Sequence, residues 1–377
     1  MKIAFVCGSF EPGCDGVGDY IRSISGEMLR QGMEVGTIAL NDKYINELTN
    51  NSNNCTPIKL AILRIPAHWP ANRRFKCAFD WMQAFNPDWV SVQYVPYSFQ
   101  HKGLPYGLAK SLLPLIQGRK VHIMFHELWL GGTPHTSVKH QIWGLLQRRL
   151  AVGLVRRLRP HAVHTSNRLY RAMLGKQNIL SEILQIPSSI AVSSLDCEKF
   201  SLELTSLGIM PADRSNWILL GMFGTISPDR DYIPFLEEQH RRSTAVGKRL
   251  AFLSIGRGGP NVEKIYAHLR NKLPGEILLY HFGEKAPAHI SAFLQAVDFG
   301  VTAVPNQLLD KSSAVAAMKL HNLIVLAPFT LHLPGYYNNN GIEYDKKCSS
   351  RPPNHFLPAT VAGILLDDLF QYDKMVR

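Results

Sequence analysis

The feature that most constrains the fold is an alternation between short apolar runs and longer amphipathic stretches. Short apolar runs are typical of buried strands, and the amphipathic stretches between them, such as 19–31 and 137–157, are typical of helices. Strands that alternate with helices predict a parallel sheet with helices on both faces. In the first half of the chain the strand-like runs are 2–7, 34–40, 89–93, 121–125, 161–165 and 183–186.

The alternation stops near 191–215, where polar and small residues dominate, and then begins again. The 377 residues are about two to three times the common domain length. We therefore expect an α/β protein with two doubly wound, Rossmann-like domains, over 1–200 and 215–355. A final helix over 358–377 is expected to pack back across the first domain. In the second half the strand-like runs are 217–223, 249–255, 276–281, 299–303 and 323–327.

Composition removes several classes of protein. No apolar run reaches the roughly 18 residues that a membrane-spanning helix needs. The N-terminal MKIAFVCGSF turns directly into Glu11-Pro12-Gly13, so we interpret it as a buried strand and not as a signal peptide. The six cysteines form no Cys-x-x-Cys pair, which argues against a zinc site and a disulfide framework. We expect a cytoplasmic protein with reduced thiols and, from its net charge of +12, an anionic partner.

Three corners in the second half combine the end of a strand with polar or glycine residues. In doubly wound sheets ligands bind outside the carboxyl ends of the strands. Glycine lets a phosphate approach the backbone, and the start of the next helix offers free N–H groups. Both Ser312 and Ser313 are natural N-caps, so the third corner either holds a diphosphate or merely caps its helix. The corner residues are Gly224, Thr225 and Arg230, then Gly256 and Arg257, and finally Asp310, Lys311, Ser312 and Ser313.

Two features of the first half also follow strands. The loop Gly16-Val17-Gly18-Asp19 differs from a dinucleotide fingerprint, because its glycines begin several residues after the strand and no acidic residue ends the next strand. A nicotinamide enzyme is therefore not expected. The pair His126-Glu127 comes at the carboxyl end of a strand, where a histidine either is a structural group or contacts a ligand.

Together these features resemble the retaining glycosyltransferases of the GT-B fold, specifically the family-4-like group typical of bacterial polysaccharide synthesis. The resemblance extends from residue 2 to about residue 327. The Gly16–Gly18 loop, His126-Glu127, the Gly224 corner and the run DFGVTAVP (298–305) carry it. Its most specific part is the alanine-rich segment before LHNLIVLA (320–327).

The resemblance implies two domains that face each other across a cleft, with a donor site in the second and an acceptor site in the first. It implies retaining, metal-independent transfer of a hexose from a nucleoside-diphosphate sugar, with UDP-glucose as the expected donor. The implied acceptor is a lipid-linked or saccharide molecule in exopolysaccharide biosynthesis. No metal and no other cofactor are expected, because helix N-termini and basic side chains would neutralise the diphosphate.

Site residues follow from the resemblance position by position. His126, Arg230 and Lys311 are the expected catalytic residues, with His126 on the donor sugar and the two cations on the phosphates. Asp19 and Glu127 are expected at the acceptor. The expected donor-binding residues are Gly16, Gly18, Gly224, Thr225, Gly256, Arg257, Asp310, Ser312 and Ser313.

The chain departs from the family pattern at two places. The family's two glutamates, separated by seven residues, correspond to Leu308 and Ala316, neither of which bonds a hydroxyl. Thr225 stands where an arginine is expected. A non-catalytic protein that binds a nucleotide or a partner is therefore the alternative, and a sugar-nucleotide epimerase is a third possibility.

A long stretch from Leu128 to Ser181 contains no aspartate or glutamate. Beside Trp129 and Trp143, such a stretch either contacts a membrane surface or is a solvated basic face. No module for nucleic acid is recognisable, so no nucleic-acid partner is expected. The basic residues are Lys139, Arg148, Arg149, Arg156, Arg157, Arg159, Arg168, Arg171 and Lys176.

Overall fold

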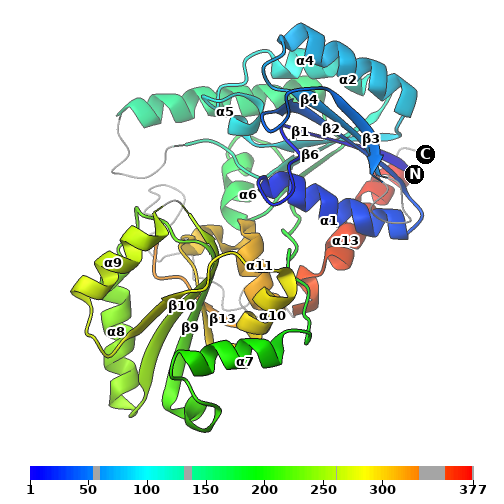
Figure 1. The fold of residues 1–377 in the computed structure, drawn as a ribbon. Coiled ribbons are helices and arrows are strands. Elements are labelled where there is room, and N and C mark those ends of the chain that lie inside the picture. The colour runs from blue at the N-terminus through cyan, green and yellow to red at the C-terminus, as the bar shows by residue number, and fades with distance from the viewer. Residues whose placement is uncertain (54–59, 131–137, 260, 331–352, 376–377) are drawn as a thin grey trace. The chain divides into compact units, whose positions relative to one another are not determined.

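The computed structural model describes residues 1–53, 60–130, 138–259, 261–330 and 353–375. They form two compact units, which we call the first unit and the second unit. The first unit contains residues 1–187 and the C-terminal helix α13 (Pro358–Met375). The second unit contains residues 188–330 and 353–357. Figure 1 shows the elements of both.

The first unit is built on an eight-stranded sheet in which every neighbouring pair is parallel except β3 and β4. In the order of the sheet, the strands are β3 (Thr49–Asn53), β4 (Leu60–Pro66), β2 (Glu34–Asp42), β1 (Lys2–Cys7), β5 (Trp89–Tyr94), β6 (Lys120–Phe125), β7 (Ala162–Thr165) and β8 (Glu182–Ile183). Besides α13, the helices are α1 (Gly16–Arg30), α2 (Ala71–Phe85), α3 (Pro96–Phe99), α4 (Leu108–Ile116), α5 (Val138–Leu158) and α6 (Arg168–Gly175).

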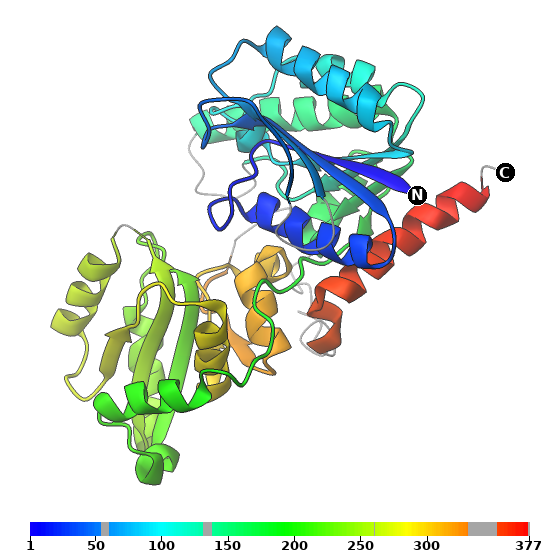
Figure 2. The ribbon, with the colours of Figure 1, turned by 45° about the vertical axis from the view of Figure 1, so that its right-hand side comes forward.

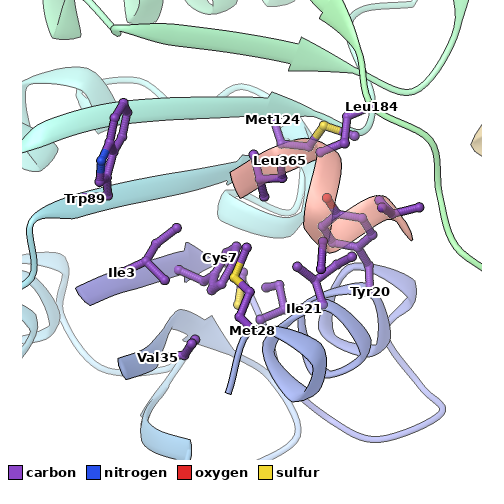
Figure 3. Packing of buried hydrophobic residues seen from close by; sticks show 14 of the residues in the cluster. Ile3, Cys7, Tyr20, Ile21, Met28, Val35, Trp89, Met124, Leu184 and Leu365 are labelled. Atoms are coloured by element: carbon purple, nitrogen blue, oxygen red, sulfur yellow. The ribbon is translucent and has the colours of Figure 1, made fainter. Parts of the chain in front are cut away.

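Helices α1 and α13 lie side by side on one face of this sheet, and α2, α4 and α5 cover the other face (Figures 1 and 2). Alternate residues of β1, including Ile3 and Cys7, point toward α1 and α13. Leu365 of α13 packs in the same cluster beside Met124 and Tyr20 (Figure 3). The C-terminal helix therefore completes the core of the first unit.

The second unit has a five-stranded parallel sheet. Its strands, in order, are β11 (Leu278–His281), β10 (Arg249–Gly258), β9 (Trp217–Thr225), β12 (Phe299–Val301) and β13 (Ile324–Leu326). One apolar cluster joins one face of the sheet to α7, α10 and α11, and another joins the opposite face to α8 and α9. The helices are α7 (Cys197–Ser206), α8 (Ile233–Ala245), α9 (Val262–Lys272), α10 (Pro287–Ala296) and α11 (Ser313–Leu320), with 3-10 turns η1 (Pro211–Asn216), η2 (Asn306–Lys311) and η3 (Pro353–Phe356).

The first unit ends at Pro187, before the expected boundary at residue 200. Residues from 188 onward belong to the second unit because they lead into α7, which packs on α10. The rings of Phe200 and Phe293 lie 5.7 Å apart, and the Ser193 amide donates to Ser291 Oγ at 2.9 Å. Within the described residues, no helix is both long enough and apolar enough to cross a membrane.

Candidate functional site

Strand order places one crevice at the carboxyl ends of the strands in each unit. In the first unit the chain runs outward from β1 to β2 and β4 and then returns beside β1 as β5. In the second unit it runs from β9 to β10 and β11 and returns beside β9 as β12. Where the strand order reverses, the connections leave in opposite directions and open a crevice at the carboxyl ends. We call these the β1–β5 crevice and the β9–β12 crevice.

The β1–β5 crevice holds a pocket of about 710 Å³. Its walls come from the carboxyl ends of β1, β2, β4 and β5 with the segments that follow them, and from the start of α1 and α2. This origin explains why residues far apart in sequence meet there. The lining residues are Ser9, Cys14, Asp15, Gly16, Asn41, Lys43, Tyr44, Ala67, Arg74, Val95, Tyr97, Ser98, Phe99, Gln100 and His101.

Hydrogen bonds between side chains hold these walls in place. Asp15 caps α1 by accepting from the Val17 amide at 3.0 Å, and its second oxygen accepts from Ser9 Oγ at 2.5 Å. Asn41 accepts from Arg74 Nη1 at 2.7 Å and donates to the Ser98 carbonyl at 2.9 Å. The polar groups of the pocket are therefore positioned without a ligand.

Gly8 brings the end of β1 against the first turn after β5. A Cβ at this position would lie 2.4 Å from the Ser98 carbonyl oxygen, a distance that real Cβ atoms do not reach. Gly16, in contrast, would meet nothing within 4 Å. The glycine that shapes this crevice is thus Gly8, which the sequence did not single out.

The chemistry of the pocket combines aromatic faces with hydrogen-bonding groups. Tyr44 and Tyr97 are 39% and 41% exposed, so their rings are open to a ligand. Lys43, Arg74 and His101 add basic groups, against one carboxylate from Asp15. Aromatic faces with many donors and acceptors suit a polyhydroxylated ligand, and the basic excess suits an anionic substituent on it.

His126 follows β6 and is buried. Its Nε2 lies 2.8 Å from Gln93 Oε1, and its ring meets the Tyr20 ring edge-on at 4.8 Å. Burial lowers the pKa of His126 to about 3, so the imidazole is neutral at physiological pH. It can therefore serve as a hydrogen-bonding group but not as a cation for a phosphate.

The bond between His126 and Gln93 is the first of a buried chain of five hydrogen bonds. Gln93 Nε2 donates to Ser91 Oγ at 2.7 Å, and Ser91 Oγ lies 2.7 Å from His122 Nδ1. His122 Nε2 lies 3.0 Å from His164 Nδ1, and His164 Nε2 lies 2.9 Å from Asp368 Oδ2 on α13. We call this chain the relay.

The carboxylate at its end sets the direction of the relay, because it only accepts. With neutral imidazoles, His164 then donates through Nε2 and accepts through Nδ1, and the same holds for His122. Ser91 donates to His122, and Gln93 accepts from His126 Nε2. This assignment leaves Nδ1 of His126 as a lone-pair acceptor.

The β9–β12 crevice is built mainly from backbone. Gly224 and Gly256 have φ angles of +100° and +111°, and a Cβ on Gly256 would lie 3.2 Å from the Gly224 nitrogen. A Cβ on Gly224 would lie 3.7 Å from Ala314, in the first turn of α11. Ser312 is the N-cap of α11 and accepts from the Val315 amide at 3.3 Å, whereas Ser313 is already helical. Two strand ends and one helix N-terminus thus converge here.

Other predicted donor residues have partners at this edge. Arg230 lies over the Phe329 ring at 5.1 Å, and the Phe329 carbonyl accepts from the Asn306 amide at 3.0 Å, which joins the loop after β9 to η2. Asp310 accepts from Lys319 Nζ at 3.3 Å. Arg257 donates to Glu284, which follows the neighbouring strand β11, at 3.0 Å.

Lys311 is the last residue of η2, immediately before the Ser312 cap, and Thr225 is exposed at the end of β9. Arg230 also lines a separate pocket of about 540 Å³ against α9, of which neither Lys311 nor Ser313 is a lining residue. Among the described residues no group of three or more His, Cys, Asp or Glu side chains is placed to hold a metal ion.

The two places of the family glutamates are apolar in structure as well as in sequence. Ala316 is buried against Leu320 and Phe356, and Leu308 is half-buried in η2. This crevice therefore offers backbone groups and cations from these segments, but no carboxylate at either place.

Of the residues predicted in the first half, only Gly16 lines the pocket of the β1–β5 crevice. Gly18 is buried against Phe10 in α1. Asp19 accepts from the Gly13 amide at 3.0 Å and so braces the loop, while the Glu127 amide donates to the Tyr94 carbonyl at 3.4 Å. Both are placed at the sheet edge, but outside the walls of this pocket.

Comparisons of the whole chain with known proteins identify its fold. No family model matches the chain, and no curated protein sequence matches it. A glycosyltransferase from Rickettsia africae is 14% identical with a TM-score of 0.54, over 100% of this chain and 98% of that one. The catalytic domain of starch synthase IV from Arabidopsis thaliana, bound to ADP and acarbose, is 11% identical with a TM-score of 0.53, over 98% and 99% of the two chains.

Epimerases share the same architecture. UDP-GlcNAc 2-epimerase from Neisseria meningitidis, bound to UDP-GlcNAc, is 12% identical with a TM-score of 0.50, over 98% of this chain and 100% of that one. At these identities the similarity concerns the fold alone. With its two sheets, parallel except for the β3–β4 pair, and helices on both faces of each, the chain has the GT-B fold of two Rossmann-like domains, as the sequence predicted.

Proposed function

We propose that the protein is a retaining, metal-independent hexosyltransferase that uses a nucleoside-diphosphate sugar, with UDP-glucose as the first donor to test. The observation that carries the proposal is the β9–β12 crevice. Two glycines with positive φ lie there so close to their neighbours that a Cβ on Gly256 would contact Gly224 and a Cβ on Gly224 would contact the first turn of α11, with Lys311 beside the cap. Such a site offers N–H groups and positive charge to a diphosphate.

A retaining transfer builds negative charge on the departing diphosphate as the anomeric carbon becomes cationic. Lys311, Arg230 and the α11 N-terminus are our candidates to stabilise that charge, which is where catalysis gains most from fixed dipoles and cations. Because the imidazole of His126 is neutral, we assign it a hydrogen bond to the transferred sugar and not a contact with phosphate.

We place the acceptor in the pocket of the β1–β5 crevice. Its exposed tyrosines and fixed polar side chains favour a saccharide, either free or attached to a lipid. This assignment replaces side-chain contacts from Asp19 and Glu127 with contacts from residues such as Asp15, Asn41 and Tyr97.

The first turns of α5 support a peripheral contact with an anionic membrane, which a lipid-linked acceptor would require. Val138, Ile142 and Leu145 recur at helical spacing and are 71%, 53% and 48% exposed. Basic residues flank this stripe, and no acidic residue occurs from 128 to 181. An exposed apolar stripe with a basic border is typical of helices that lie on a membrane surface.

The rival proposal, a binding protein without turnover, is favoured by the absence of carboxylates at Leu308 and Ala316. Epimerases with the same fold supply the other rival. Incubation of the full chain with UDP-, ADP- and GDP-glucose, with and without EDTA, separates the three. Slow release of free nucleoside diphosphate that is insensitive to EDTA supports a transferase, and conversion of the sugar without release supports an epimerase. Binding of a nucleotide without either product supports the binding protein.

A further inference from the structure

A small pocket between α4 and α5 of the first unit lies outside both crevices and has no part in the proposed transfer. We propose that it binds a phosphate group, carried by a soluble metabolite or by a lipid headgroup. Its volume is about 180 Å³, room for a phosphate and a few waters at about 30 Å³ each. The lining residues that carry the proposal are Tyr94, Gly107, Lys110, Arg149, Gly153 and Arg157.

Three cationic side chains line this pocket, and no carboxylate that lines it balances their charge. Lys110 lies in the first turn of α4, and Arg149 and Arg157 lie on the facing helix α5. None of the three has an ion pair within the described ranges, and no carboxylate lines the pocket. Like charges brought close together repel, and an anion between them removes that cost.

The start of α4 adds backbone donors. The helix begins at Leu108 after Gly107, which has a φ of 75° and supplies no capping side chain. The first N–H groups of a helix have no partner inside it, and here the first turn, from Gly107 to Lys110, lines the pocket. An uncapped helix N-terminus with a neighbouring cation cluster is the arrangement that proteins use to hold phosphate.

Tyr94 gives an independent indication of a missing ligand. Its side chain is 1% exposed and lines the pocket, yet its hydroxyl has no hydrogen-bond partner among the described residues. Burial raises the pKa of Tyr94, so the hydroxyl keeps its proton and can donate. Buried hydroxyls without a partner are uncommon in native proteins, and a phosphate oxygen would satisfy this one.

Gly153 keeps the space open. It lies in the interior of α5, where glycine is less favourable than alanine, and its φ angle is not positive. A Cβ at this position would meet no atom within 4 Å. Packing therefore does not require glycine, and the missing side chain enlarges the pocket instead.

The test measures equilibrium binding of the full chain to two probes at fixed ionic strength. The first probe is glycerol 3-phosphate, followed by calorimetry, and the second is phosphatidylcholine vesicles with added phosphatidic acid, followed by sedimentation. Variants are Arg149→Ala, Tyr94→Phe and Gly153→Ala. Arg156→Ala is the matched control, because Arg156 is exposed on the same helix but does not line the pocket.

Loss of a charged donor should weaken binding about tenfold in Arg149→Ala, and loss of the hydroxyl about fivefold in Tyr94→Phe. Gly153→Ala should weaken binding with all charges kept, and Arg156→Ala should change it less than about twofold. Binding to both probes identifies a phosphate site open to soluble ligands, and binding to vesicles alone, with the same variant pattern, identifies a lipid headgroup. Absence of binding to both probes, or equal losses in Arg149→Ala and Arg156→Ala, would overturn the proposal.

Discussion

The two crevices lie at corresponding positions in two similar sheets, but they are built differently. In the β1–β5 crevice, side chains are fixed by one another before a ligand arrives, as Ser9 and Asp15 or Asn41 and Arg74 are. In the β9–β12 crevice, glycine backbones and a helix N-terminus do most of the construction. Under our proposal, the first unit would therefore recognise its ligand through side chains, whereas the second unit would recognise a charged group through backbone.

The largest expected effect concerns the construction of the first crevice. Gly8→Ala forces a Cβ into the Ser98 backbone. We therefore expect the free energy of unfolding, measured in urea, to fall by about 3 kcal/mol. Gly16→Ala is the matched control, since its Cβ meets nothing, and it should leave stability within about 0.5 kcal/mol. Equal effects of the two substitutions would remove the argument that close backbone contact shapes this crevice.

The next effect tests whether buried polar groups in the first unit work as a network. Ser91→Ala removes one buried hydrogen bond from Gln93 Nε2 and one from His122 Nδ1, and it should cost about 2 kcal/mol of unfolding free energy. Ser25→Ala makes the same change at an equally buried hydroxyl that has no hydrogen-bond partner among the described residues, so it should be close to neutral. If Ser25→Ala is the more damaging change, the relay contributes little.

A substitution in the β9–β12 crevice should change the affinity for nucleotide but not the stability of the fold. Lys311→Ala removes a cation from the proposed diphosphate site and should weaken UDP binding about tenfold, with an unchanged unfolding midpoint. Lys248→Ala is the control, because Lys248 is exposed at the amino end of β10, the opposite edge of the same sheet. Calorimetry with UDP measures the affinity of both variants for the nucleotide. An equal loss in the control would mean that net charge alone attracts the nucleotide.

The smallest effect is a pH dependence of the first unit. The pKa of His126 is about 3 in the folded protein and about 6.5 when unfolded, so the unfolded chain binds more protons between these values. Stability from this group is present above pH 6.5 and falls as the pH falls. From pH 6.5 to 5.5 the loss should be about 1 kcal/mol. His126→Gln should remove this part of the slope and keep the part from His122, whose pKa burial also lowers. A parallel slope in the variant would show that other groups cause all of it.

The sequence predicted the two sheets because buried strands are continuous apolar runs, and β1, β2, β5 and β6 begin within one residue of where the pattern begins. It missed β4, and it missed β3, whose residues 49–53 are rich in asparagine and whose strand state depends on pairing with β4. It expected helices between the strands but gave no bounds for α2, and it did not single out Arg74 of the pocket. Propensity is a local signal, and pairing with a distant strand overrides it.

The candidate site residues also divide into those that local sequence could predict and those that depend on distant contacts. Gly224, Gly256 and Ser312 were visible in sequence because turns and helix caps use local chemistry. Tyr97 and Asn41 were not, since an ordinary residue becomes a pocket wall only through the topology of the sheet. The relay was least visible of all, because its last bond joins His164 to Asp368, which are 204 positions apart.

The most direct test of the account is backbone hydrogen exchange of the full chain with and without UDP, in the wild type and in Lys311→Ala. If the diphosphate binds in the β9–β12 crevice, exchange should slow at the end of β9 and at the first turn of α11, around Gly224 and Ser313, and the variant should lose that protection. Protection elsewhere only, or protection at α11 that Lys311→Ala leaves unchanged, would contradict the assignment of the diphosphate to the β9–β12 crevice.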